Sequence, residues 1–193
     1  MRCNSSNNDT IADLDAVLKV QKPARPWEFY ICTEIHKRLH KMDENSDHFM
    51  SMPRCYTFDD GSVFVSEHQL LSLLEICNIV NQMKKTSVES IAMYFTIEML
   101  HVLEKLQSSQ IIHGDIKPDN FLVQKKPELN LEAASPDEMF KDAKATLEMI
   151  DFGVSIDMSL FHQRQTFTHK FDKVDSRCPE MVEDRPWTYQ VRM

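Results

Sequence analysis

The sequence predicts an α+β fold in which a small sheet-bearing lobe precedes a larger, mostly helical lobe, with a cleft between them. Strand and helix patterns follow one another in the order strand, helix, two strands, two helices, loop and strand. Such an order suits a sheet and its helix at one end of the molecule and a helical body at the other. At 193 residues, the chain is long enough to bury one core.

The small lobe begins with Ala16–Val20, a strand-like run that sets one lysine among apolar residues. After Pro23 and Pro26, a helix is expected to start near Trp27 and Glu28. Its mostly apolar stripe is Phe29, Ile31, Ile35 and Leu39.

Two strands are expected next, around 50–58 and 62–66. Asp59-Asp60-Gly61 lies between them, and Asp-Gly between strands is a good signal for a tight turn.

The larger lobe is expected to begin with a helix from Leu70, followed by a longer helix over residues 88–106. The longer helix has apolar residues at three- and four-residue steps, which is typical of a face packed on a core. Residues 124–146 are rich in Lys, Glu, Pro, Ala and Asp and are interpreted as a surface insertion. Leu147–Ile150 is expected to be a short strand that leads into Asp151.

Composition excludes several classes of protein. The net charge of −8 argues against a protein that binds nucleic acid directly. The five cysteines form no CxxC pair and fit reduced thiols, and the histidines show no zinc-ligand spacing. No apolar run approaches the length of a membrane span, and the polar segment 1–15 is expected to be disordered rather than a signal peptide.

Two motifs indicate a chemistry: His-Gly-Asp-Ile-Lys-Pro-Asp-Asn at 113–120 and Asp-Phe-Gly at 151–153. Phosphoryl transfer from a nucleotide needs a carboxylate near the attacking hydroxyl, a cation near the moving phosphate, and oxygen ligands for magnesium. Asp115, Lys117, Asn120 and Asp151 are the residue types for these tasks, in the order in which a protein kinase places them.

Each of these residues also has an ordinary interpretation. Asp115 is the proposed catalytic base, but a loop aspartate can simply cap a turn. Lys117 would stabilise the transferred phosphoryl group, or it is a surface lysine. Asn120 and Asp151 would bind Mg²⁺ through oxygen, although both residue types are also common in turns.

Nucleotide binding is assigned to the small lobe and to the hinge that follows it. Lys19 would reach the phosphates of ATP, with Glu28 as its partner, while a strand lysine turned to solvent and a rival partner at Glu34 remain open. The stretch Glu67, His68 and Gln69 should be the hinge, where backbone groups hydrogen-bond the adenine edge; an ordinary loop is the alternative.

Beyond these motifs, the chain resembles the Bub family of mitotic checkpoint serine/threonine kinases. The resemblance runs from about residue 17 to 190 and rests on unusual segments: 19–30, 61–67, 111–121, 155–161 and 185–190. It favours the active branch of the family, because Asp115, Lys117, Asn120 and Asp151 are all present, and the degenerate branch often lacks several of them.

The resemblance implies a kinase that uses ATP and Mg²⁺, acts in spindle-checkpoint signalling and phosphorylates protein substrates, with a histone tail among them. It implies checkpoint and kinetochore proteins as partners, and a location in the nucleus and at kinetochores, otherwise in the cytoplasm. The net charge and the lack of a long apolar run, for their part, predict no direct contact with nucleic acid or membrane.

The resemblance also implies a protein-kinase-like two-lobed fold that is incomplete. No glycine precedes Lys19, so the glycine-rich strands are absent from the small lobe, and the later helices of the large lobe are absent too. The expected division is 16–66 for the small lobe, 67–70 for the hinge and 71–193 for the first part of the large lobe. A non-catalytic kinase-like fragment or binding module is therefore the alternative to an active enzyme.

Position 114 is unusual within this resemblance. Most kinases have an arginine there that pairs with a phosphate on the activation segment, and Gly114 has no side chain to do so. The expectation is that no such phosphate-dependent switch exists here, although Thr166, Thr168 and Ser176 could be modified for other reasons.

Overall fold

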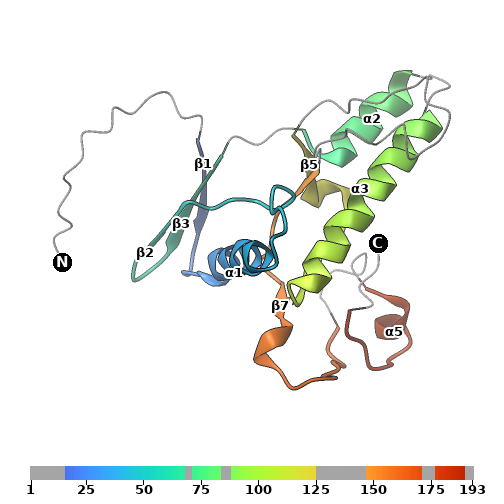
Figure 1. The fold of residues 1–193 in the computed structure, drawn as a ribbon. Coiled ribbons are helices and arrows are strands. Elements are labelled where there is room, and N and C mark those ends of the chain that lie inside the picture. Colours follow the sequence, from blue (N-terminus) through green and yellow to red (C-terminus); the bar gives the residue numbers. More distant parts are fainter. Residues whose placement is uncertain (1–15, 68–70, 84–87, 125–146, 171–176, 190–193) are drawn as a thin grey trace.

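A computed structural model describes residues 16–67, 71–83, 88–124, 147–170 and 177–189 (Figure 1). The predicted N-terminal segment 1–15 and nearly all of the predicted insertion at 124–146 lie outside the described residues. Within the described ranges, a small sheet with one helix lies at one end of the molecule, and two further helices lie at the other.

The small sheet consists of β1 (Ala16–Gln21), β2 (Arg54–Thr57) and β3 (Ser62–Glu67) in the antiparallel order β1-β3-β2. The turn between β2 and β3 is closed by a hydrogen bond of 2.7 Å from the N–H of Phe58 to the carbonyl of Gly61. The hairpin predicted from Asp-Asp-Gly is therefore confirmed. Lys19 lies opposite Phe64 in the register of β1 and β3.

Helix α1 (Trp27–Lys41) packs the sheet against the rest of the molecule. Ile31, Ile35 and Leu39 repeat at four-residue steps, lie on one face of the helix and are fully buried. Glu28 in the first turn and basic residues in the last turn suit the helix dipole. The predicted helix and its apolar stripe are confirmed.

The strand expected over 50–58 is wrong in its first half, because residues 48–50 pair with another strand. The N–H of Met50 donates to Met149 in β6 (Leu147–Met149), and the N–H of Met149 donates to His48. Pro53 has no N–H to offer a sheet, and β2 begins only after it. The segment before β2 therefore joins the sheet-bearing end to the helical end.

The helical end contains α2 (Leu73–Met83) and the longer α3 (Val88–Ser108). The first of these helices was expected from Leu70 but begins at Leu73. Ser72 caps it, since the N–H of Glu75 donates to the Ser72 hydroxyl and the Glu75 carboxylate accepts the N–H of Ser72.

Among the described residues, no helix is long and apolar enough to cross a membrane.

Two short strand pairs lie under α3. Strand β4 (Ile111–Ile112) pairs with β7 (Ile156–Asp157), and β5 (Phe121–Val123) pairs with β6. The 3-10 turn η1 (Pro118–Asn120) joins the loop after β4 to β5. Both motifs found in the sequence, 113–120 and 151–153, are therefore held at strand ends.

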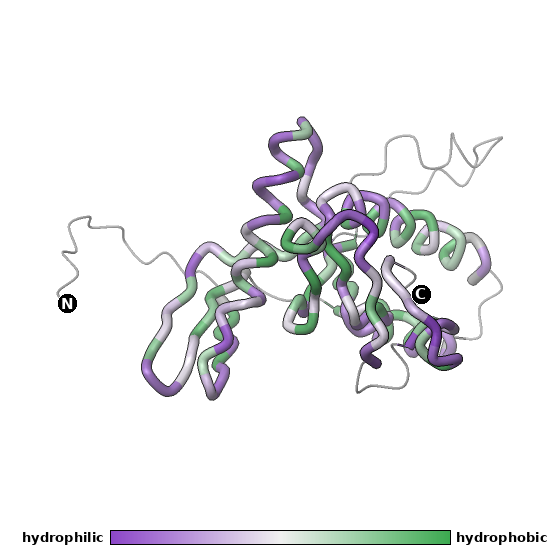
Figure 2. Tube along the Cα trace, turned by 90° about the horizontal axis from the view of Figure 1, so that it is seen from below, coloured by the Kyte–Doolittle hydropathy of each residue, from purple (hydrophilic) through white to green (hydrophobic). Residues whose placement is uncertain are grey.

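Apolar residues gather into two clusters. The larger one joins α1, α3, β3, β5 and β6, and the smaller one consists of Ile112, Cys178, Met181 and Trp187. Along the helices, hydrophobic and hydrophilic residues alternate in the way an amphipathic helix requires (Figure 2).

The chain after β7 forms the 3-10 turn η2 (Met158–Leu160) and then runs along the edge of the molecule toward α5 (Pro179–Val182) (Figure 1). Phe167 and Trp187 exchange two backbone hydrogen bonds, and their rings are 5.1 Å apart. The Trp187 indole N–H also donates to the carbonyl of His169. Backbone and ring contacts therefore hold this segment together.

The hairpin turn gives a stability prediction. A Cβ on Gly61 would lie 2.9 Å from the backbone oxygen of Gln21, so Gly61→Ala must displace one strand. We expect it to lower the free energy of unfolding by about 1–3 kcal/mol, as overpacking does.

Gly153→Ala is the matched control, because its Cβ would lie at an ordinary 3.6 Å from Asp151 Oδ1. Urea-induced unfolding followed by circular dichroism measures both variants. An equal loss of stability in the two would contradict the close approach at Gly61.

Candidate active site

Lys19, Glu28 and Asp151 come from three different elements and meet at one point. Lys19 Nζ is 2.9 and 2.8 Å from the two carboxylate oxygens of Glu28, and 3.1 Å from Oδ1 of Asp151. β1 supplies the lysine, α1 the glutamate and the loop after β6 the aspartate. One ammonium group therefore links the sheet-bearing end to the helical end.

Burial makes this ion pair strongly interacting. The Glu28 side chain is 1% exposed, whereas Lys19 is 36% exposed and so keeps one side toward solvent. Burial alone would lower the pKa of Lys19, but the hydrogen bond and charge of Glu28, with those of Asp151, raise it. The lysine therefore stays protonated at neutral pH, next to the place where anionic groups would approach.

Glu28 has further partners besides Lys19. Its carboxylate accepts the side-chain amide N–H of Gln21 at 3.5 Å, and hydrogen bonding by the Phe152 backbone lowers its pKa. Burial raises the pKa of Glu28, and the ammonium of Lys19 opposes that effect. A single carboxylate thus fixes the positions of β1 and of the Asp151-Phe152 backbone relative to α1.

The rival glutamate lies elsewhere. Glu34 Oε1 is 2.7 Å from Lys37 Nζ, and Glu34 Oε2 is 3.1 Å from Arg38 Nη2. Lys19 does not point away from the protein as a solvated strand lysine would. The structure therefore brings Lys19 together with Glu28 and not with Glu34.

The backbone at Asp151 is left-handed, with φ of 66°. Aspartate is among the residues that tolerate this region. The next residue, Phe152, is fully buried, and its ring centre is 4.9 Å from that of His113 and 6.4 Å from that of Phe49. The turn therefore sends the aromatic side chain into the core and the carboxylate toward Lys19.

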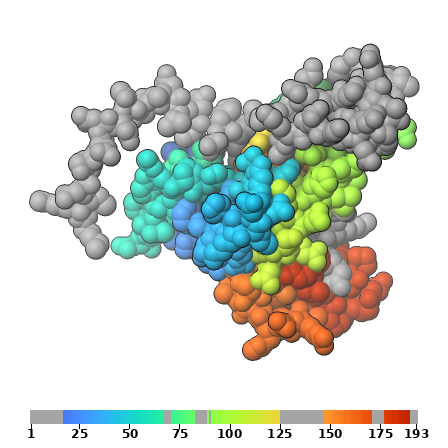
Figure 3. Space-filling model, in the orientation of Figure 1, coloured from blue at the N-terminus to red at the C-terminus, as the bar shows by residue number. Residues whose placement is uncertain are grey.

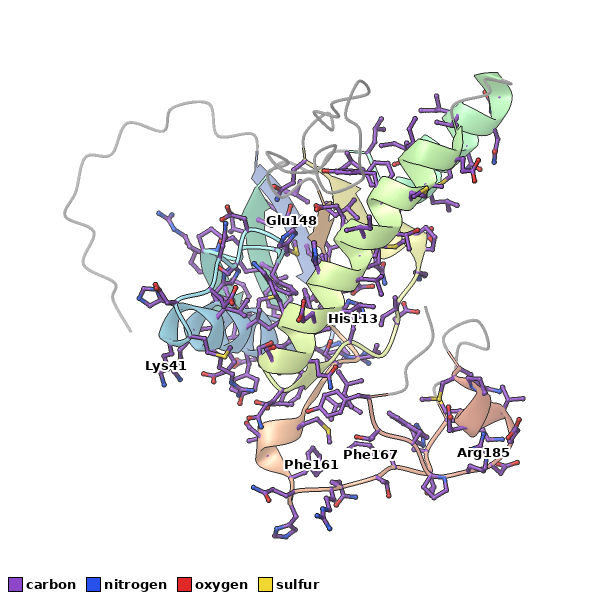
Figure 4. The ribbon with its side chains drawn as sticks, turned by 45° about the vertical axis from the view of Figure 1, so that its right-hand side comes forward. Lys41, His113, Glu148, Phe161, Phe167 and Arg185 are labelled. Atoms are coloured by element: carbon purple, nitrogen blue, oxygen red, sulfur yellow. The ribbon has the colours of Figure 1, made fainter. Side chains whose placement is uncertain are left out.

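His113 anchors the loop that carries Asp115. The N–H of Asp115 donates to His113 Nδ1, so the ring is neutral and its Nε2–H donates to the carbonyl of Ile150, at 2.9 Å. The Ser155 hydroxyl donates to the His113 carbonyl. Figure 4 labels His113 beside the lower part of α3.

Asp115, Lys117 and Asn120 are neighbours at the end of this loop. Lys117 Nζ is 3.0 Å from Asp115 Oδ2. The Asn120 amide donates to the Asp115 carbonyl at 2.7 Å and contacts Asp115 Oδ2 at 3.4 Å. Asp115 and Asn120 are buried, and Lys117 is partly exposed. The left-handed Gly114, with φ of 85°, precedes this group.

The oxygen atoms of Asn120 and Asp151 suit a hard cation that also binds the phosphates of a ligand. Because Asn120 uses its nitrogen to hold Asp115, its oxygen is the atom left for a metal, and Asp151 adds a half-exposed carboxylate. Among the described residues, no group of three or more His, Cys, Asp or Glu side chains could hold a metal. Two oxygen ligands fit a Mg²⁺ ion that takes its other ligands from phosphates and water.

The predicted hinge is only partly visible. Glu67 is the last residue of β3, and His68 and Gln69 lie outside the described residues. Ser66, the residue before Glu67 in β3, is buried.

One cluster beside the site was missed by reasoning from sequence. Arg38 Nη1 and Nη2 are 2.8 and 2.6 Å from the two oxygens of Asp157, and the Tyr30 hydroxyl donates to the same carboxylate at 2.8 Å. Asp157 lies far along the chain from α1, and each charged residue alone is indistinguishable from a solvated one in the sequence. Only the segment 155–161, already noted as unusual, indicated this region.

Comparisons with known proteins identify the family of the chain. The family model described as protein kinase domain matches residues 16–193. The chain is 38% identical over 179 residues to the mitotic checkpoint serine/threonine-protein kinase BUB1 of Mus musculus, covering 91% of this chain and 16% of that protein. It is 37% identical over 184 residues to the protein of the same name in Arabidopsis thaliana, covering 95% and 35%.

A solved structure is also similar. The crystal structure of the BubR1 kinase domain superposes with a TM-score of 0.73 at 38% identity, covering 90% of this chain and 49% of that chain. The chain thus spans about half of that domain and a sixth to about a third of these two curated relatives.

The buried His113 makes stability depend on pH. Burial lowers its pKa from the ordinary 6.5, so the unfolded chain binds a proton that the folded chain excludes. Stability contributed by the neutral ring is therefore present above pH 6.5 and is lost as pH falls toward the lower folded value. One such group changes the free energy of unfolding by at most about 1.4 kcal/mol per pH unit.

We expect His113→Asn to be less stable at pH 7.5 and to lose less further stability than the wild type between pH 7.5 and 5.5. Thermal unfolding at several pH values measures this, with His40→Asn at an exposed position of α1 as the control. An unchanged pH dependence in His113→Asn would show that His113 is not the neutral buried ring described above.

Proposed function

The chain belongs to the protein kinase domain family, and we propose that it transfers the γ-phosphate of ATP to the hydroxyl group of a serine or threonine in a protein. One observation carries this proposal. Lys19, Glu28 and Asp151 meet at one point, and Asp115, Lys117 and Asn120 meet at another, at the ends of the strands that carry the two motifs. These are the parts that phosphoryl transfer requires.

The nucleotide would lie against Lys19. Its ammonium, already held by Glu28, would bind the phosphates of ATP without first having to be ordered, which is the benefit of a preorganised site. Asn120 and Asp151 would hold Mg²⁺ through oxygen. Bound ATP supplies the phosphoryl group, and Mg²⁺ neutralises charge on its oxygens.

Asp115 and Lys117 would act on the substrate. Asp115 would orient the hydroxyl group and accept its proton, and Lys117, 3.0 Å from the same carboxylate, would stabilise negative charge on the transferred group. The hydrogen bond from Asn120 to the Asp115 carbonyl keeps the metal ligand and the base in one fixed arrangement.

The small lobe is proposed to be 16–66 and the first part of the large lobe 71–193, with Glu67, His68 and Gln69 as the hinge that binds the adenine. The position of β3 supports this division. Its last residue is Glu67, and the next bridge along the chain joins Ser72 to Leu122 at the helical end.

The names of the relatives support a role in the mitotic spindle checkpoint. We propose that the chain belongs to a kinase that acts at kinetochores in the nucleus, with checkpoint proteins as partners and a protein substrate such as a histone tail.

Nucleotide binding is the first test. Mg²⁺ with ATP should raise the thermal unfolding temperature of the chain, and Asp151→Asn should abolish that rise because one metal ligand is lost. Asp43→Asn is the matched control, since Asp43 is an exposed aspartate with a similar left-handed backbone, φ of 58°. A magnesium-independent rise, or one that Asp151→Asn retains, would contradict the proposed metal ligands.

Transfer is tested separately from binding. Asp115→Asn should keep the Mg²⁺–ATP response and lower the rate of phosphate transfer to a histone-tail peptide by a factor of about 10²–10⁴, the usual loss for a general base. Asp119→Asn, on the same loop with an exposed side chain, should leave the rate unchanged. Binding without transfer in the wild type would instead favour the alternative function, a kinase-like binding module.

A further inference from the structure

A buried ion pair joins α1 to the segment that follows the Asp-Phe-Gly motif. The two terminal nitrogens of Arg38 donate hydrogen bonds of 2.8 and 2.6 Å to the two carboxylate oxygens of Asp157. The Asp157 side chain is fully buried, and Arg38 is 17% exposed. Bidentate arginine–carboxylate pairs are among the strongest and most directional polar contacts in proteins.

The pair is part of a larger network. Arg38 also donates to the carbonyl of Ser109 at 2.9 Å and to the Ser159 hydroxyl at 3.1 Å, while the N–H of Ser159 donates back to Asp157. Burial alone would raise the pKa of Asp157, but the hydrogen bonds from Arg38, Ser159 and Tyr30 lower it to about 2. The carboxylate is therefore charged across the physiological range of pH.

A second anchor lies at the other end of α1. The Trp27 indole N–H donates to the carbonyl of Ser155 at 2.8 Å, and the Trp27 ring packs on Tyr30 with centres 5.1 Å apart. Trp27, Tyr30, Glu34 and Arg38 recur at three- and four-residue steps, so they share one face of the helix. The two anchors are about three turns apart, which fixes both the tilt of α1 and its rotation about its axis.

The adjacent face of α1, about a quarter turn around the helix axis, carries the group that the active site needs. Glu28 and the buried Ile31 and Ile35 turn toward the sheet and core. A rotation of the helix would therefore move Glu28 away from Lys19. In the space-filling view, the segment after Asp151 (orange) lies directly below α1 (blue) (Figure 3).

We propose that Arg38 is a positioning residue for the nucleotide site. Its ion pair with Asp157 holds α1 in the orientation that keeps Glu28 on Lys19. Both partners of this pair are side chains of the chain itself, whereas Gly114 has no side chain that could bind a phosphate. This inference rests on the proposed nucleotide site, and it adds the contact that sets the geometry of that site.

The chemistry of Arg38 makes the position selective for arginine. One planar guanidinium reaches Asp157, the Ser109 carbonyl and Glu34 at once, and the single ammonium of lysine cannot reproduce that fork. Arg38→Lys should therefore restore little of what Arg38→Met loses.

The first test needs no nucleotide. Hydrogen–deuterium exchange of the whole chain compares Arg38→Met with Lys37→Met. Lys37 is the adjacent residue, lies more than half exposed and contacts Glu34 but not Asp157. Arg38→Met should speed exchange both in 27–34 and in 153–159. Faster exchange confined to residues next to Arg38, or equal in the two variants, would overturn the proposal.

The second test asks whether the effect passes through Lys19. The dissociation constant of a fluorescent ATP analogue with Mg²⁺ is measured for the wild type, Arg38→Met, Lys19→Met and the double variant. Arg38→Met should weaken binding on the order of tenfold in the wild-type background and less than about twofold in the Lys19→Met background. Lys37→Met should leave the wild-type constant unchanged.

The outcomes distinguish failure of the inference about Arg38 from failure of the proposed function. Equal losses in both backgrounds would mean that Arg38 supports the fold but does not position Lys19, which overturns the inference. If the wild type binds no nucleotide, the proposed function is contradicted, and hydrogen exchange decides alone whether Arg38 orients α1.

Discussion

The ion pair between Lys19 and Glu28 fixes how the sheet, helix α1 and the loop after β6 fit together. It joins a strand, a helix and, through Asp151 and the N–H of Phe152, the loop after β6. Because the Glu28 carboxylate is buried, its charge is stable only where the ammonium of Lys19 and the backbone donor of Phe152 both reach it. The register of β1, the rotation of α1 and the burial of Phe152 therefore have to be correct together.

Helix α1 transmits this constraint to the rest of the molecule. Its apolar face packs into the core, and its first turn supplies Glu28. Hydrogen bonds from Trp27 and Arg38 on its polar face bind residues 155–159. The segment beyond is held in turn by the contacts between Phe167 and Trp187. Figure 4 shows Phe161 and Phe167 along this extended segment, away from the sheet. The helix is thus the mechanical link between the nucleotide side of the site and the segment after Asp-Phe-Gly.

Much of this arrangement could be predicted from sequence, because its signals are local. The apolar steps of α1, the Asp-Gly turn and the spacing of Asp115, Lys117 and Asn120 all lie within a few residues of one another. The pair of Lys19 with Glu28 was one of two open choices, since helical periodicity alone does not say which glutamate faces the strand. The contact of Arg38 with Asp157 and the crossing of residues 48–50 to β6 depend on how distant segments pack. The unusual segment 155–161 marks the region of Asp157 but does not indicate which residue Asp157 contacts.

Chemical labelling of lysines with an acyl-phosphate derivative of ATP tests directly whether Lys19 lies against the phosphates of a bound nucleotide. Such a reagent transfers its acyl group to an amine that lies against the phosphates, and mass spectrometry identifies the modified residue. A nucleotide site at Lys19 predicts labelling of Lys19 and Lys117 that Mg²⁺–ATP suppresses. Lys22, an exposed lysine paired with Asp60, should be labelled weakly and without competition. Equal labelling of all three lysines, or labelling of Lys19 that ATP does not reduce, would contradict a nucleotide site organised by Lys19 and Glu28.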